Sequence, residues 1–144
     1  MKVAITRLDP AAVLPSQAHE DDAGYDLCAL EGVVLAAGGG RALVRTGLAI
    51  AVPSGYAAFV LPRSGLALKH GVTLVNTPGL IDSQYRGELK VLMLNTDPGE
   101  KYEVCAGDRI AQLVVQAVAY VEWEVVEELD NTKRDQYGFG STGR

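Results

Sequence analysis

The sequence predicts an all-β fold, a closed sandwich of the jelly-roll type with one short helix. Apolar runs are short and rich in β-branched residues, and Gly, Pro, Asn or Asp interrupts them too often for long helices. Many short strands in one small domain favour a jelly roll, because this fold hides the sheet edges that otherwise aggregate. The 144 residues, 48% of them hydrophobic, predict a single domain with one core.

The predicted strands are separated by clear turns. The segments 52–56 and 96–100 each combine a proline with a glycine and predict hairpin connections. From Ser64 to His70 we expect one short helix with Ser64 as its N-cap, and the glycines beside it limit its length. The predicted strands are 41–52 with a break near Gly47, 57–61, 72–75, 88–95 and 109–126.

We expect the chain to be ordered up to residue 128 and mobile beyond it. Residues 1–128 have the strand pattern of the core, whereas residues 129–144 are polar and rich in glycine and predict a mobile C-terminal tail. The start lacks the apolar run of a secretory signal, and no stretch reaches the roughly 18 apolar residues of a membrane span. We therefore expect a cytoplasmic protein without membrane contact.

Cys28 and Cys105 lack the spacing of a zinc clamp or redox pair and are expected to be buried thiols.

The charge balance narrows the possible ligands. The chain has 13 Lys and Arg residues and 18 Asp and Glu residues, which gives a net charge of -5. No positive field is available for a nucleic-acid polymer, so polymer binding is not expected. A small anion remains possible, because a few arginines and backbone amides bind one whatever the total charge.

Residues 61–67 form the first candidate anion site. A strand ends at a proline, and Arg63, Ser64 and the amides of the helix start follow it. Phosphate oxygens bind guanidinium, hydroxyl and amide donors of this kind. The alternative for this segment is a capped turn with a solvated arginine.

Residues 75–88 form the second candidate site, a turn-rich hairpin between two strands. It presents an amide, a carboxylate and an aromatic ring in Asn76, Asp82 and Tyr85. Asp82 follows the apolar pair Leu80 and Ile81, so its carboxylate is placed to take a proton from an attacking water at a pocket wall. The alternative for Asp82 is a turn-capping role.

Five short segments in order resemble the five motifs shared by the trimeric dUTPases. They are Ala23-Gly24-Tyr25-Asp26-Leu27, Arg63-Ser64-Gly65, the Asn76–Glu88 hairpin, Gly107-Asp108-Arg109-Ile110-Ala111-Gln112-Leu113, and Gly138-Phe139-Gly140-Ser141-Thr142-Gly143. The resemblance implies a distorted jelly roll of the dUTPase-like (β-clip) type. It also implies hydrolysis of dUTP to dUMP and pyrophosphate with Mg²⁺, which limits uracil in DNA and supplies dUMP for thymidylate synthesis.

The resemblance assigns a role to each part of the site. Asp82 would deprotonate the water that attacks the α-phosphorus, and the ring of Tyr85 would leave no room for a 2′-hydroxyl. Asp26 would contact Mg²⁺ through water, with the metal held mainly by the triphosphate. Asp108 is expected to be a turn acid and Arg109 to pair with a neighbouring acid. The uracil would bind Asn76 and the backbone of Leu80, Ile81 and Lys90, and the phosphates would bind Arg63, Ser64, Gly65 and Gln112.

The C-terminal motif resembles a lid over the substrate. Phe139 would stack on uracil, and Arg134, Gly140, Ser141 and Thr142 would close over the γ-phosphate. This tail departs from the family pattern at Asp135 and Tyr137, and an acid at Asp135 would repel phosphate. The resemblance also implies a homotrimer whose active sites each combine one chain's phosphate motifs, a second chain's hairpin and a third chain's tail.

Two other functions remain open at this point. The first is a dCTP deaminase of the same fold, which would remove an exocyclic amine instead of cleaving a phosphoanhydride. The second is a non-catalytic jelly-roll module that keeps the fold without turnover. The Asp82–Tyr85 hairpin and the Phe139 tail favour a dUTPase over both.

Overall fold

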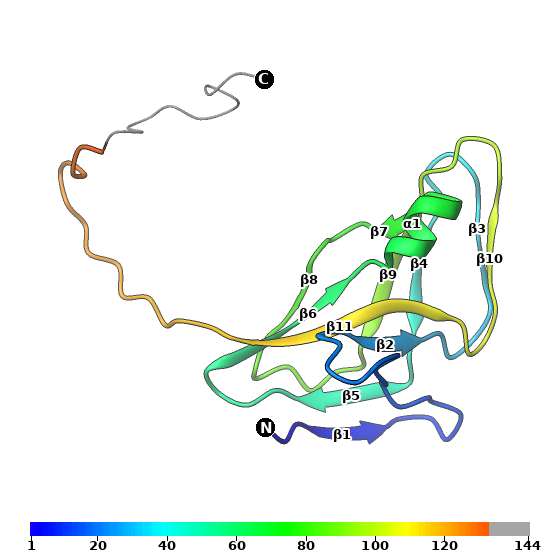
Figure 1. Ribbon diagram of the computed structural model, residues 1–144, viewed down its shortest axis with the longest axis horizontal. Helices are drawn as coiled ribbons and strands as arrows, with labels where there is room; N and C mark the ends of the chain where they lie inside the picture. Colours follow the sequence, from blue (N-terminus) through cyan, green and yellow to red (C-terminus); the bar gives the residue numbers. More distant parts are fainter. Residues whose placement is uncertain (133–144) are drawn as a thin grey trace.

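The structure of the protein, a computed structural model, describes residues 1–132. In this part the chain is built of short strands with a single helix, which confirms the all-β prediction (Figure 1). The elements are β1 (Ala4–Arg7), β2 (Tyr25–Cys28), β3 (Val33–Leu35), β4 (Arg41–Arg45), β5 (Leu48–Ala51), β6 (Tyr56–Leu61), α1 (Ser64–His70), β7 (Val72–Leu74), β8 (Gly79–Ile81), β9 (Lys90–Asn95), β10 (Tyr102–Val104) and β11 (Arg109–Ala117).

The strands form four small sheets that together make a distorted jelly roll. The strand orders are β2-β11-β6-β8, β4-β9-β7, β1-β5 and β10-β3. Every pairing among the described strands is antiparallel and joins strands that are not neighbours in sequence. The turns 52–56 and 96–100 therefore link β5 to β6 and β9 to β10 in different sheets. The two turns were predicted correctly, but their assignment as hairpins was wrong.

The core collects buried side chains from all four sheets. Alternation along the strands produces it: in β9 Val91, Met93 and Asn95 are buried while the residues between them are partly exposed. Asn95 is polar but satisfied, because its Nδ2 donates to the carbonyls of Leu35, Ala36 and Glu100. The largest fully buried side chains are Leu27, Leu35, Leu48, Leu89, Met93, Ile110, Val72, Val91, Val104, Asn95 and Thr46.

The last strand is shorter than the sequence predicts. β11 ends at Ala117, which pairs with Tyr56, the first residue of β6. The chain beyond it, residues 118–132, is exposed and runs away from the sheets (Figure 1). The prediction of a strand through residue 126 was therefore wrong. The Tyr120 hydroxyl holds the first part of this segment to the turn before β6, where it accepts the Gly55 N–H at 3.0 Å.

The helix α1 has the predicted bounds but a different cap. Arg63 occupies the N-cap position with extended backbone angles, and no side chain caps the helix, so Ser64 as N-cap was wrong. Gly71 ends the helix in the left-handed region at φ 63°, and its N–H bonds the carbonyl of Ala67. None of the helical segments in the described chain has the length and apolar character that a bilayer crossing requires.

Candidate functional site

One part of the candidate site lies where three strands of the largest sheet meet. Gln112 on β11 pairs with Asp26 on β2 on one side and with Leu61 on β6 on the other. Arg63 follows two residues after Leu61 and begins the segment that enters α1. Sheet register therefore brings together three residues that are far apart in the sequence, namely Asp26, Arg63 and Gln112.

Asp26 is the centre of this group and is only 5% exposed. Its Oδ1 lies 3.2 Å from Nε of Arg63, and its Oδ2 lies 3.2 Å from Nη1 of Arg109. The Gln112 amide donates to Oδ1 at 3.5 Å. Two guanidinium groups thus compensate one buried carboxylate. The predicted pairing of Arg109 with a neighbouring acid is confirmed.

The donors predicted to hold phosphate lie next to these two ion pairs. Ser64 and Gly65 are exposed at the start of α1, and its first turn carries no acidic residue. Arg63 is anchored twice, because its Nη1 also donates to the carbonyl of Arg109 at 2.9 Å. A hydroxyl, backbone amides and a fixed guanidinium are therefore available to an anion on one exposed surface.

Asp82 lies on the second part of the site, in the segment between β7 and β9. These two strands pair with each other, which confirms the predicted hairpin, and β8 within the segment pairs with β6. Asp82 follows β8 directly and is exposed. Its carbonyl accepts the N–H of Tyr85 at 3.1 Å, so residues 82–85 form a turn.

An open hollow of about 630 Å³ lies along this turn. Leu80, Asp82 and Tyr85 line it, as the sequence analysis expected of a pocket wall. No local sequence pattern marks the other residues of the lining, because the chain after β11 leaves the strand that the sequence predicts there. They include Tyr56, Ala57, Val118 and Tyr120.

The Tyr85 ring is held firmly although it is 43% exposed. Its hydroxyl donates to the carbonyl of Glu88 at 3.0 Å. Gly87 lies under the ring, where an added Cβ would come within 2.6 Å of the Tyr85 Cζ atom. The ring position thus depends on one hydrogen bond and on the absence of a side chain at residue 87.

The remaining residues predicted to bind uracil surround the same hairpin. Asn76 is exposed and its amide lies beside the backbone of Gly79. Leu80 is 57% exposed, whereas Ile81 packs against the hydrophobic core. The Lys90 ammonium lies 3.8 Å from a carboxylate oxygen of Glu88. The hairpin therefore offers an exposed amide and main-chain groups on an apolar support.

The two parts of the site are separated within one chain. Ile81 pairs with Ala58 near the start of β6, whereas Arg63 lies five residues further along the extended chain. Five extended residues span roughly 16 Å. Asp82 and the donors at Arg63, Ser64 and Gly65 therefore lie near opposite ends of β6.

The other residues singled out in the sequence either have structural roles or lie beyond residues 1–132. Asp108 accepts the N–H of Cys105 at 2.8 Å, which confirms the turn role expected for it. The prediction of two buried thiols was wrong, because Cys28 is only half-buried and Cys105 is exposed. Within residues 1–132 no group of three or more His, Cys, Asp or Glu side chains is arranged to hold a metal. Arg134, Phe139, Gly140, Ser141 and Thr142 lie outside the described residues.

Comparison with known sequences identifies relatives along nearly the whole chain. The dUTPase family model matches residues 11–143. The chain is 57% identical over 143 residues to the deoxyuridine 5′-triphosphate nucleotidohydrolase of Thermobifida fusca, covering 99% of this chain and 79% of that protein. It is 50% identical over 144 residues to the protein of the same name from Wolinella succinogenes, covering 100% of this chain and 95% of the relative.

Solved structures with a similar fold belong to the same family as the sequence relatives. The dUTPase of Staphylococcus bacteriophage 80alpha with dUPNHPP has a TM-score of 0.90 to this chain at 29% identity, and 99% of each chain is covered. A mutant dUTPase from phage phi11 of S. aureus, which coordinates a structural Mg(II) ion, has a TM-score of 0.81 at 27% identity and covers 89% of this chain and 98% of its own. The family model, the relatives and the shared jelly roll lead to one conclusion: the chain belongs to the dUTPase family.

Proposed function

We propose that the chain hydrolyses dUTP to dUMP and pyrophosphate by attack of water on the α-phosphorus. The observation that carries the proposal is the exposed carboxylate of Asp82 in the same hollow as the fixed ring of Tyr85. A carboxylate within hydrogen-bond reach of a bound water can accept a proton from it. The same carboxylate is placed to bind the 3′-hydroxyl of the sugar, which would orient the nucleotide for attack.

Selectivity for the deoxyribose and for uracil comes from the hairpin in this proposal. The Tyr85 ring lies against the sugar and leaves no room for a 2′-hydroxyl, so ribonucleotides are rejected. Asn76 and the backbone of residues 80, 81 and 90 bind the polar edge of uracil. Cytosine presents the wrong donors and acceptors to these groups, and a 5-methyl group would collide with the hairpin.

The phosphate chain is assigned to Arg63, Ser64, Gly65 and Gln112. Magnesium fits beside them only as a partner of the substrate, because both oxygens of Asp26 already engage arginines. A water-mediated contact to Asp26 leaves those ion pairs intact and suits an ion that keeps several waters. When bound, Mg²⁺ would neutralise charge on the phosphate oxygens. Arg63, fixed by Asp26 and the Arg109 carbonyl, would orient the triphosphate for attack.

Shared active sites in a homotrimer complete the proposal. The roughly 16 Å between the ends of β6 support it, because an Asp82 hairpin from one chain and the Arg63 donors from another can then face the same nucleotide. The residues expected from the tail are Arg134, Phe139, Gly140, Ser141 and Thr142, which would close over the substrate. Trimer formation, closure by residues 129–144 and the cytoplasmic location remain predictions.

A panel of nucleotides tests the activity. With Mg²⁺, purified protein is expected to release pyrophosphate from dUTP and to leave dTTP, dCTP and UTP largely intact, and a chelator should stop the reaction. Release of ammonia from dCTP would instead identify the deaminase alternative, and no turnover of any nucleotide would favour the non-catalytic module. Sedimentation of the same sample measures the oligomeric state independently of activity.

A further inference from the structure

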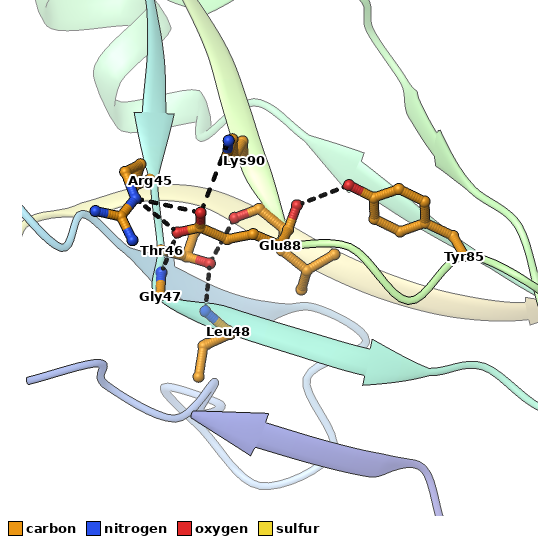
Figure 2. A network of polar contacts seen from close by, with 8 residues as sticks. Arg45, Thr46, Gly47, Leu48, Tyr85, Glu88 and Lys90 are labelled. Atoms are coloured by element: carbon orange, nitrogen blue, oxygen red, sulfur yellow. Dashed lines mark hydrogen bonds and ion pairs between the residues drawn. The ribbon is translucent and has the colours of Figure 1, made fainter. Parts of the chain in front are cut away.

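Glu88 is held at the end of the Asp82 hairpin by a network that the proposed chemistry does not use. Its side chain is 11% exposed and its two oxygens accept the Arg45 Nε at 3.1 and 3.2 Å. The backbone N–H of Gly47 donates to Oε1 at 2.9 Å, and the Lys90 ammonium lies 3.8 Å from Oε2 (Figure 2). One carboxylate thus joins the hairpin to the corner between β4 and β5.

The next residue strengthens the same connection. The N–H of Leu89 donates to the Leu48 carbonyl at 2.7 Å, and the Leu89 carbonyl accepts the Thr46 hydroxyl at 2.6 Å. Leu89 is only 1% exposed, so its side chain anchors this point in the core. Residues 88 and 89 are therefore fixed by several hydrogen bonds at once, which restricts movement of the backbone between them.

This fixed backbone supports the Tyr85 ring. The hydroxyl of Tyr85 donates to the main-chain carbonyl of Glu88, on the side away from the carboxylate (Figure 2). Glu88 is not among the residues that line the hollow containing Asp82. The main-chain carbonyl that holds the ring connects Glu88 to this hollow.

We propose that Glu88 is a positioning residue that sets sugar selectivity, because its carboxylate holds the carbonyl to which the Tyr85 ring is bonded. The inference rests on the proposed role of Tyr85 against deoxyribose. Without the carboxylate, the Arg45 and Gly47 bonds are lost. The peptide between residues 88 and 89 then keeps the bond from the Leu89 N–H to the Leu48 carbonyl but loses its second tether and can shift. The ring then moves with it and opens the space that a 2′-hydroxyl needs. A displacement of about 1 Å is enough to change rates by large factors in a fixed site.

The test measures kcat/KM for UTP and for dUTP in wild type, Glu88→Ala and Glu88→Gln. In Glu88→Ala the ratio of UTP to dUTP is expected to rise about tenfold, mainly through a lower KM for UTP. In Glu88→Gln the ratio should stay near that of wild type, because the amide oxygen replaces Oε1, which accepts both Arg45 and Gly47. Glu103→Gln, an exposed change on β10, controls for loss of charge alone.

Two further variants decide the question if Glu88→Ala does not fold. Arg45→Met removes one donor to Glu88 from a side chain that is 41% exposed, so the fold should tolerate it and the UTP to dUTP ratio should rise less than in Glu88→Ala. Tyr85→Phe removes the hydroxyl and should raise the ratio by itself. Combining Tyr85→Phe with Arg45→Met should add nothing further, because both act through one bond.

The possible results separate the two proposals. If wild type does not hydrolyse dUTP, the proposed function fails, and this inference fails with it. If wild type is active but the ratio stays unchanged in Glu88→Ala or in Arg45→Met, only the positioning role is overturned. An equal fall of kcat/KM for both nucleotides, with a lower melting temperature, assigns Glu88 to stability alone and also overturns it.

Discussion

The Nε atom of Arg63 lies 3.2 Å from Oδ1 of Asp26, and this ion pair ties the segment before α1 to strand β2. The side chain of Asp26 is 6% exposed and that of Arg63 is 24% exposed, so water screens the pair only partly. Asp26 also forms an ion pair with Arg109, so a substitution of Asp26 leaves two guanidinium groups without this carboxylate. The pair is thus important both for the fold and for the surface proposed to bind phosphate.

Asp26→Asn is expected to destabilise the protein by about 2 kcal/mol, because it keeps the size of the side chain but removes the charge that compensates both arginines. Urea unfolding followed by circular dichroism measures the change. Glu31→Gln, an exposed change of the same kind, is the matched control and should leave the midpoint unchanged. Equal midpoints for Asp26→Asn and wild type would contradict the structural role of the pair.

Asp82→Asn is expected to lower kcat for dUTP by about 10²- to 10⁴-fold, because the amide cannot take a proton from water. The KM should change little, since the substituted residue keeps its shape and its place on an exposed turn. Steady-state kinetics with a melting curve for each variant make the measurement. Asp108→Asn is the contrasting variant, because Asp108 only accepts a backbone N–H, and it should retain the wild-type kcat. A similar loss of kcat in both would argue against Asp82 as the base.

Gly87→Ala is expected to lower kcat/KM for dUTP because the new methyl group would lie within 2.6 Å of the Tyr85 Cζ atom and displace the ring. Stability should change by less than about 1 kcal/mol, since residue 87 is exposed. Gly99→Ala provides the control, because its nearest neighbour would be 4.0 Å away. Activity of Gly87→Ala equal to that of Gly99→Ala would show that the ring position does not matter.

Local patterns in the sequence predicted β4, β5, β6, β7, β9 and β11, but not the short strands β1, β2, β3, β8 and β10. The prediction for 88–95 places β9 correctly but begins early, because residues 88 and 89 are taken up by the contacts to the β4–β5 corner. The strand predicted to reach residue 126 stops at Ala117, where its partner β6 begins. Strand propensity alone does not extend a ladder beyond its partner. β1 was missed because all four of its residues are exposed, so its short sequence carries no burial pattern.

In the candidate site too, contacts between residues close in sequence were predicted, whereas contacts between residues far apart in sequence were not. Asp82 and Tyr85 lie within one turn, so a short motif was enough to place them together. The contact of Glu88 with Arg45 spans 43 residues, and the contact of Asp26 with Arg109 spans 83. Pairing between strands that are not consecutive brings such residues together, and the local patterns of one sequence do not show which strands pair. The buried charge of Asp26 and the support of Tyr85 were therefore found only in the structure.

The two cysteines should differ in their reaction with iodoacetamide near neutral pH. Cys105 is exposed, whereas Cys28 is half-buried on β2. Burial raises the pKa of the Cys28 thiol, and the neighbouring carboxylate of Asp26 raises it further. A raised pKa keeps the thiol protonated and unreactive near neutral pH, because the thiolate is the nucleophile.

Peptide mass spectrometry over time measures both alkylation rates, and Cys105 is expected to react first. The rate at Cys28 should increase with pH, and its pH profile in the native protein should be displaced to higher pH relative to the same thiol in urea, because unfolding removes both the burial and the fixed charge of Asp26. In urea the two cysteines should react at similar rates. Faster alkylation of Cys28 than of Cys105 in the native protein would contradict the burial of that thiol against β11.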